Sequence, residues 1–200
     1  IEESGSAKSV RDDLDKIIDI LSRMIKSAKE IDGVGISIPG GVDNENGVII
    51  EGGAIPVLAG VDLIGILNEK TGFNVAIEND ANCVVLAEKC IGNGKDCSSF
   101  VCMTIGTGIG GGMFINNKIH VGKNFFAGEF GYIIIEDFED YNNIPTLSFS
   151  SATEPLLKQV ALAKEMKFKD INGLKVFKMI ENGDEVVIEA YRKWLRKLCI

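Results

Sequence analysis

The chain has 200 residues, of which 46% are hydrophobic and 25% are charged, and this is the composition of a globular protein with room for a substantial core. Its 21 basic and 29 acidic residues give a net charge of −8, which argues against binding of nucleic acid or an anionic membrane through this segment. Five cysteines without a C-x-x-C pair accompany one histidine, so we expect reduced thiols in a cytoplasmic protein and no structural zinc site.

The first 91 residues alternate between helix-like and strand-like segments. Apolar residues recur at steps of three and four in the helix-like segments, whereas the strand-like segments are short apolar runs. We expect helices over 9–30, 61–71 and from Asn82 to about Ile91, and strands over 34–38, 47–50 and 74–77. This alternation indicates an α/β layer with a mostly parallel sheet.

The polar, glycine-bearing segment from Gly92 to Asp96 is typical of a joint between domains. We therefore expect one domain over 1–94 and a second over 95–200. In the second domain the sequence predicts a strand over 99–105, a glycine cluster over 106–112, a hairpin formed by 113–115 and 118–121, and helices over 151–168 and 173–199.

The glycine cluster follows an apolar strand directly. Its residues Gly106, Gly108, Gly110 and Gly111 leave few side chains in the way of a bound phosphate, and Thr107 can add a hydroxyl donor. The alternative is a tight glycine-rich hairpin that binds no ligand. The cluster is not a Rossmann fingerprint, because no helix follows it, and it is not a P-loop, because no Gly-Lys-Ser/Thr closes it.

A second candidate site lies where the strand over 74–77 ends. Asn79 and Asp80 stand between this strand and the next helix, and ligands of open α/β sheets bind at the carboxyl ends of strands. A carboxylate there could accept a proton from a hydroxyl nucleophile, as phosphoryl-transfer enzymes require. The alternative is that Asp80 or Asn79 only caps the following helix.

Glu129 offers a second carboxylate, held between Gly128 and Phe130-Gly131. A glutamate in this setting could accept hydrogen bonds from two hydroxyls of a polyol. It could equally be an exposed charge in a loop, and the local sequence leaves both interpretations open.

Four segments in this order resemble the ROK family of bacterial sugar kinases and sugar-responsive repressors. The segments are Gly35 to Asp43, Glu78 to Asn82, Ile105 to Gly112, and Ala127 to Tyr132. The resemblance extends from about residue 9 to residue 200. No single segment is decisive, but the four together are specific for the family.

The resemblance implies an α/β fold of the actin-like ATPase (ribonuclease H-like) type, with two domains and with ATP and a sugar bound between them. Asp80 resembles the general base that takes the proton of the attacking sugar hydroxyl. Asn79 and Glu129 resemble residues that bind sugar hydroxyls, and the Gly106–Gly112 loop resembles a loop that contacts ATP. Mg²⁺ would bridge the phosphates, and we expect the protein to form a homodimer.

Departures from the family pattern also bear on function. The family's first phosphate loop, Asp-x-Gly-Gly-Thr, does not occur before residue 9, and family kinases continue beyond residue 200, so the chain resembles an internal fragment that is inactive by itself. Many members have a histidine and a cysteine-rich zinc cluster where this chain has Tyr132 and no cysteine over 136–155. The chain thus resembles the zinc-free branch that includes β-glucoside kinases, and its sugar could be a hexose, an amino sugar or a β-glucoside.

A function of a different class stays open at this point. ROK-type transcriptional repressors bind a sugar without phosphorylating it, and they carry a helix-turn-helix ahead of the first phosphate loop. A repressor that lacks this DNA-binding segment would resemble the present chain. The presence of Asp80 and of the glycine cluster favours the kinase.

Overall fold

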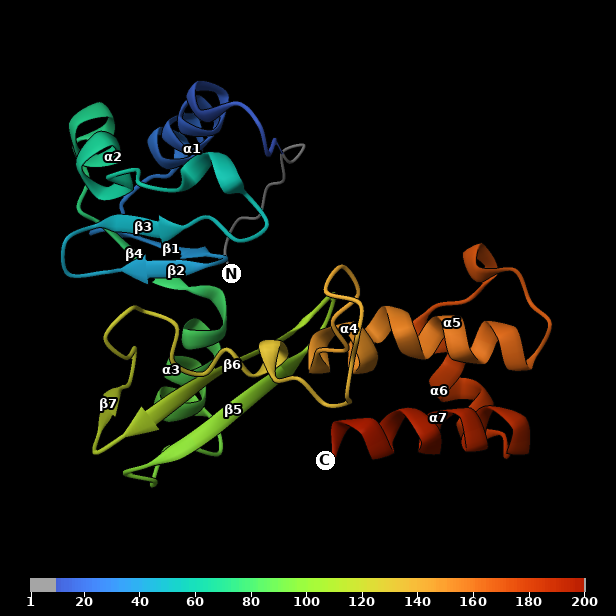
Figure 1. Ribbon diagram of the computed structural model, residues 1–200. Coiled ribbons are helices and arrows are strands. Elements are labelled where there is room, and N and C mark those ends of the chain that lie inside the picture. Colours follow the sequence, from blue (N-terminus) through green and yellow to red (C-terminus); the bar gives the residue numbers. More distant parts are fainter. Residues whose placement is uncertain (1–9, 200) are drawn as a thin grey trace. The chain divides into compact units, whose positions relative to one another are not determined.

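A computed structural model describes residues 10–199 of the chain (Figure 1). These residues form two compact units. The first unit extends to Phe100 and includes Met113–Ala127, and the second comprises Val101–Gly112 and Gly128 onward. The strands over 100–105 and 109–115 are therefore each divided between the two units. The predicted domain division at residue 94 stays a prediction.

The first unit begins with a helix and a parallel pair of strands. Helix α1 (Leu14–Ser27) starts after Asp13, whose carboxylate accepts a hydrogen bond from the Lys16 backbone N–H at 3.0 Å, as an N-cap does. It is shorter than the predicted 9–30 because Ala28 adopts an extended backbone, and residue 9 lies outside the described residues. Strand β1 (Val34–Ile38) pairs in parallel with β4 (Val75–Asn79), which confirms the expected parallel sheet.

Apolar side chains of this unit form one core beneath α1 and α2 (Leu63–Thr71), and Figure 1 shows both helices on the same side of the strands. The short strands β2 (Gly41–Asp43) and β3 (Val48–Glu51) pair antiparallel, and a 3-10 turn, η1 (Pro56–Leu58), leads into α2. Ile49, Leu63 and Leu67 are fully buried, so burial of apolar surface is the main force that holds these elements together.

Helix α3 (Asp80–Ile91) follows β4 without a loop. It is followed by β5 (Phe100–Ile105), β6 (Ile109–Ile115) and β7 (Lys118–Ile119), which form one sheet in that order. The predicted hairpin is confirmed, since β6 and β7 pair antiparallel around Asn116 and Asn117. Both asparagines have positive φ angles, of 51° and 63°, and this is the geometry that a two-residue hairpin turn requires.

The second unit is mainly helical. Its helices are η2 (Phe130–Tyr132), α4 (Leu147–Ser151), α5 (Thr153–Ala163), η3 (Phe168–Asp170), α6 (Gly173–Glu181) and α7 (Glu185–Leu198). Val160, Val176 and Val187 of the three longest helices are fully buried in a shared core. The Trp194 indole N–H donates to the Ala152 carbonyl at 3.1 Å, so the one tryptophan ties α7 to the start of α5.

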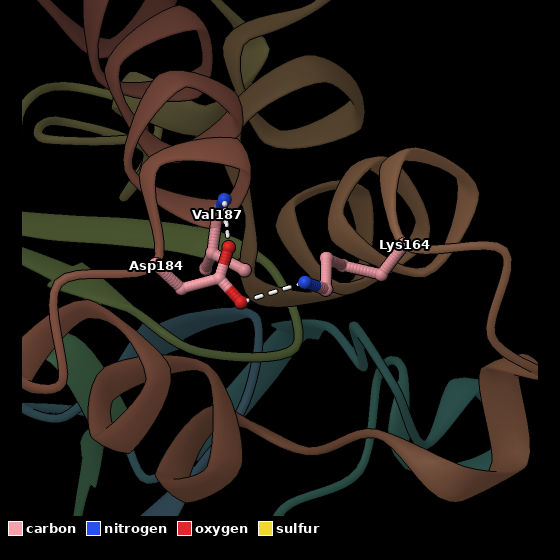
Figure 2. Close-up of polar contacts among 3 residues, drawn as sticks. All are labelled: Lys164, Asp184 and Val187. Carbon is pink, nitrogen blue, oxygen red and sulfur yellow. Dashed lines mark hydrogen bonds and ion pairs between the residues drawn. The ribbon is translucent and has the colours of Figure 1, made fainter.

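The prediction of a single helix over 173–199 is wrong, because the chain turns between α6 and α7. Gly183 has a φ of +77°, which glycine tolerates and which a helix does not allow. The Asp184 carboxylate then caps α7 by accepting from the Val187 N–H at 3.3 Å, and it also accepts from Lys164 Nζ at 2.7 Å (Figure 2). The predicted helix over 151–168 likewise ends early, at Ala163.

Within the part of the chain that the structure describes, no helix combines the length and the apolar character needed to span a bilayer.

Candidate functional site

The carboxyl ends of β1 and β4 lie side by side, because Ile38 pairs with Asn79 in the parallel register. The turn from Pro39 to Gly41 follows one strand, and the start of α3 follows the other. The Asn79 side chain joins the two, since its Nδ2 donates to the Gly40 carbonyl at 2.9 Å and its Oδ1 accepts from the Asn82 N–H at 3.0 Å. This edge of the first unit is therefore a fixed platform.

Asp80 is the first residue of α3 and is exposed to solvent. Its Oδ1 accepts from the neighbouring Ala81 N–H at 2.8 Å, and no other described residue donates to this carboxylate. The N-cap of α3 is Asn79 and not Asp80. Helix capping therefore accounts for the asparagine and leaves the Asp80 carboxylate open to a ligand.

Glu78, which was not predicted as a site residue from the sequence, is fixed by three hydrogen bonds to its carboxylate. Its Oε1 accepts from the Asn79 backbone N–H at 2.8 Å and from Asn82 Nδ2 at 3.0 Å, and its Oε2 accepts from Asn44 Nδ2 at 2.6 Å. The sequence signal was the presence of Asn79 and Asn82 one and four residues after a strand-end glutamate. Only the folded chain adds Asn44, which comes from the turn after β2.

The same edge of the sheet carries concentrated negative charge. Burial raises the pKa of the Cys83 thiol; a hydrogen bond with the Ser37 side chain opposes this rise, and the charges of Glu78 and Asp80 add to it. Cys83 is thus a protonated thiol beside two carboxylates, as expected of a reduced structural cysteine.

The glycine cluster of the second unit divides into an exposed turn and a buried strand. Gly106, Thr107 and Gly108 form the turn between β5 and β6 and are exposed. The turn is anchored on α4 and α5, because Ile109 N–H donates to Ser148 Oγ at 2.9 Å and the Gly106 carbonyl accepts from the Thr153 N–H at 3.0 Å. No described residue accepts from the N–H groups of Thr107 and Gly108, so these two donors fit a phosphate oxygen.

Gly110 and Gly111, by contrast, belong to β6. Gly111 is buried, and a Cβ atom there would collide with the Phe130 ring and lie 2.7 Å from the Gly128 carbonyl oxygen. Close packing against Phe130 and Gly128 therefore explains why this position is a glycine. Phosphate binding by Gly110 and Gly111 stays a prediction. The backbone N–H groups that no described residue uses are those of Thr107 and Gly108.

Glu129 is positioned by close contact between two stretches of backbone. Gly128 has a φ of +88°, and a Cβ at this position would lie 2.9 Å from the Gly111 carbonyl oxygen. Glu129 follows Gly128 and is the N-cap residue of η2. The structure brings it and the glycine cluster together in the second unit. Asn79 and Asp80 come together in the first unit.

A cavity of about 720 Å³ adjoins the exposed turn of the second unit. Thr107 lines it together with hydroxyl side chains of the α4 region, and Lys158 and Lys197 bring positive charge to it. Each lysine is also ion-paired, with Glu154 at 2.7 Å and Glu136 at 3.0 Å respectively. This cavity could not be predicted from the sequence, because its walls come from segments up to 90 residues apart in the chain.

None of the described residues form a group of three or more His, Cys, Asp or Glu side chains that could hold a metal ion. The five cysteines form no disulfide with one another. Tyr132 projects into solvent, with 71% of its surface exposed.

The sequence profile of the ROK family matches residues 2–200 of the chain. The chain belongs to the ROK family. It is 35% identical to a beta-glucoside kinase of Listeria innocua over 195 residues, which cover 97% of this chain and 66% of that kinase. The chain thus spans just under two thirds of the length of this relative.

Two further proteins are similar to the chain. The solved structure of the Lmo2764 protein from Listeria monocytogenes superposes with a TM-score of 0.86 at 35% identity, covering 96% of this chain and 67% of that one. The xylose repressor of Bacillus subtilis is 33% identical over 178 residues, covering 86% of this chain and 46% of the repressor. The actin-like ATPase fold of the ROK sugar kinases, expected from the resemblance, is confirmed.

Proposed function

We propose that the full-length protein is a sugar kinase that transfers a phosphoryl group from ATP to a sugar hydroxyl. The observation that carries this proposal is the Asp80 carboxylate, which is exposed at the carboxyl edge of the β1–β4 pair while Asn79 caps the helix. The similarity of the chain to a protein named beta-glucoside kinase supports the same activity.

Each residue of the site has a role in this reaction. Asp80 accepts the proton of the attacking hydroxyl, which makes the oxygen a stronger nucleophile. Asn79 Nδ2 uses one hydrogen for the Gly40 carbonyl, and its second hydrogen can bind a sugar oxygen. Glu129 accepts hydrogen bonds from sugar hydroxyls.

The exposed turn at Thr107 binds phosphate oxygens in this proposal. The N–H groups of Thr107 and Gly108 and the Thr107 hydroxyl are the donors, and Gly106 leaves space for the phosphate because a Cβ there would have open surroundings. Mg²⁺, when bound, neutralises charge on the phosphates. We propose that the protein holds no zinc, since Tyr132 stands where zinc-binding family members have histidine.

For the sugar we propose a hexose, an amino sugar or a β-glucoside, and the β-glucoside is favoured by the relative of that name. A coupled assay of ADP release over these three classes tests the proposal on the full-length protein. We expect ADP release that depends on one of the sugars. If none of the sugars supports ADP release but calorimetry shows that one of them binds, the result would favour a repressor instead.

The repressor is the second candidate because the chain is also 33% identical to a xylose repressor. It would retain sugar binding and would not need a proton acceptor at position 80.

We place the protein in the cytoplasm, where its reduced cysteines fit. The expected homodimer remains a prediction, which light scattering on the full-length protein tests.

A further inference from the structure

Glu78 lies at the end of β4, two residues before the proposed base, and is half-buried. Its carboxylate accepts three hydrogen bonds, and two of them converge on a single oxygen, Oε1. The two donors to Oε1 are the Asn79 N–H, at the end of the strand, and the Asn82 amide, in the first turn of α3.

These bonds close a ring around Asp80. Asn82 is buried, with 7% of its surface exposed, and its N–H donates to Asn79 Oδ1 while its side chain donates to Glu78 Oε1. Residues 78, 79 and 82 are thus fixed to one another, and the backbone of residue 80 is held between them. Asp80 itself makes only a local bond to Ala81 among the described residues, so its direction depends on this ring.

We propose that Glu78 is the positioning residue of the site, and that its Oε1 atom holds the strand-to-helix junction so that the Asp80 carboxylate faces the sugar hydroxyl. This inference rests on the proposed function of Asp80. Glu78 acts through geometry and not through its charge. A reacting group displaced by about 1 Å can cost about 10²-fold in rate, so the predicted effect falls on kcat.

Two conservative variants separate geometry from charge. Glu78→Gln removes the charge and keeps a carbonyl oxygen at the same reach, so both bonds to Oε1 can remain, and only the exposed bond from Asn44 is lost. Glu78→Asp keeps the charge and withdraws the oxygens by one methylene. We expect Gln to retain kcat within about threefold and Asp to lower it by about 10–10²-fold. The reverse order would overturn the inference.

The decisive measurement is a double-mutant cycle in the full-length protein, with kcat for the best sugar as the readout and thermal unfolding as the check on folding. If Glu78 acts through Asp80, Glu78→Asp lowers kcat strongly in the wild type and by less than about threefold in an Asp80→Asn background. A merely structural role predicts independent effects that multiply, and that result would overturn the inference.

A matched control removes a carboxylate elsewhere in the first unit. Glu69 is exposed on α2, and Glu69→Gln should leave kcat unchanged. If Asp80→Asn alone leaves kcat unchanged, the proposed function of Asp80 fails and this inference fails with it. If Asp80→Asn acts but Glu78→Asp does not, only the positioning role of Glu78 is overturned.

Discussion

Asn79 and Asp80 are adjacent, and either could have capped α3, because Asn and Asp are equally good N-caps. The sequence therefore left the choice open. The structure assigns the cap to Asn79, whose Oδ1 accepts from the Asn82 N–H. The distinction depends on the backbone, since Asp80 already lies inside the helix, and side-chain chemistry alone could not have supplied it.

A pair of substitutions separates ligand binding from packing in the glycine cluster. Thr107→Val removes an exposed hydroxyl while keeping the side-chain shape, so we expect unchanged thermal stability and a KM for ATP raised about 3–10-fold, the worth of one hydrogen bond. An unchanged KM for ATP would contradict phosphate binding at this turn.

Gly111→Ala should act in the opposite way. Its new methyl group would collide with the Phe130 ring, and overpacking of a buried position costs about 1–3 kcal/mol of folding free energy. Chemical denaturation measures this loss. A Gly111→Ala protein of normal stability that binds ATP weakly would show instead that this glycine serves the nucleotide directly.

At the level of secondary structure, the sequence predicted most elements and misjudged several ends. Periodicity located α1, α2 and α3, and the apolar runs located β1, β4 and β5. The break between α6 and α7 was missed because Asn182, Gly183 and Asp184 interrupt a helical pattern that continues on both sides. Its stabilising contact comes from Lys164, twenty residues away (Figure 2).

Asp184 should make the stability of this helix pair depend on pH. The hydrogen bond from Lys164 lowers the pKa of the Asp184 carboxyl in the folded protein. The ion pair therefore stabilises the protein above the ordinary aspartate pKa of about 4, and this contribution is lost as pH falls through the lower folded value.

Asp184→Asn keeps the helix cap and removes the ion pair. We expect its Tm to lie about 1–3 °C below the wild type at neutral pH, and the difference to vanish in acid. Asp184→Ala also removes the cap, and its Tm should fall by a further 2–4 °C approximately, about the cost of losing one helix cap. A Tm difference for Asp184→Asn that is the same at pH 7 and pH 3 would contradict the role of the ion pair.

At the scale of the whole molecule, four short segments in order were enough to predict the ROK family and its fold. Each segment was ambiguous alone, because a strand-end carboxylate or a glycine cluster has ordinary structural explanations. The sequence could not reveal the hydrogen bond from Asn44 to Glu78 or the cavity beside Thr107, since both depend on tertiary contacts between distant segments.

Metal content is a second property of the whole protein. We expect full-length protein purified without chelators to contain no stoichiometric zinc by elemental analysis, because Tyr132 replaces histidine and residues 136–155 contain no cysteine. One equivalent of zinc, with unfolding on chelation, would show that this region had been misinterpreted.

The most direct test of the kinase assignment is Asp80→Asn in the full-length protein. The substitution removes the proton acceptor and leaves a hydrogen-bonding side chain of similar shape, while the cap on α3 stays with Asn79. We predict that kcat falls by about 10²–10⁴-fold, with the sugar dissociation constant and the Tm close to those of the wild type. Turnover near the wild-type rate in a protein of normal stability would contradict the assignment of Asp80 as the base.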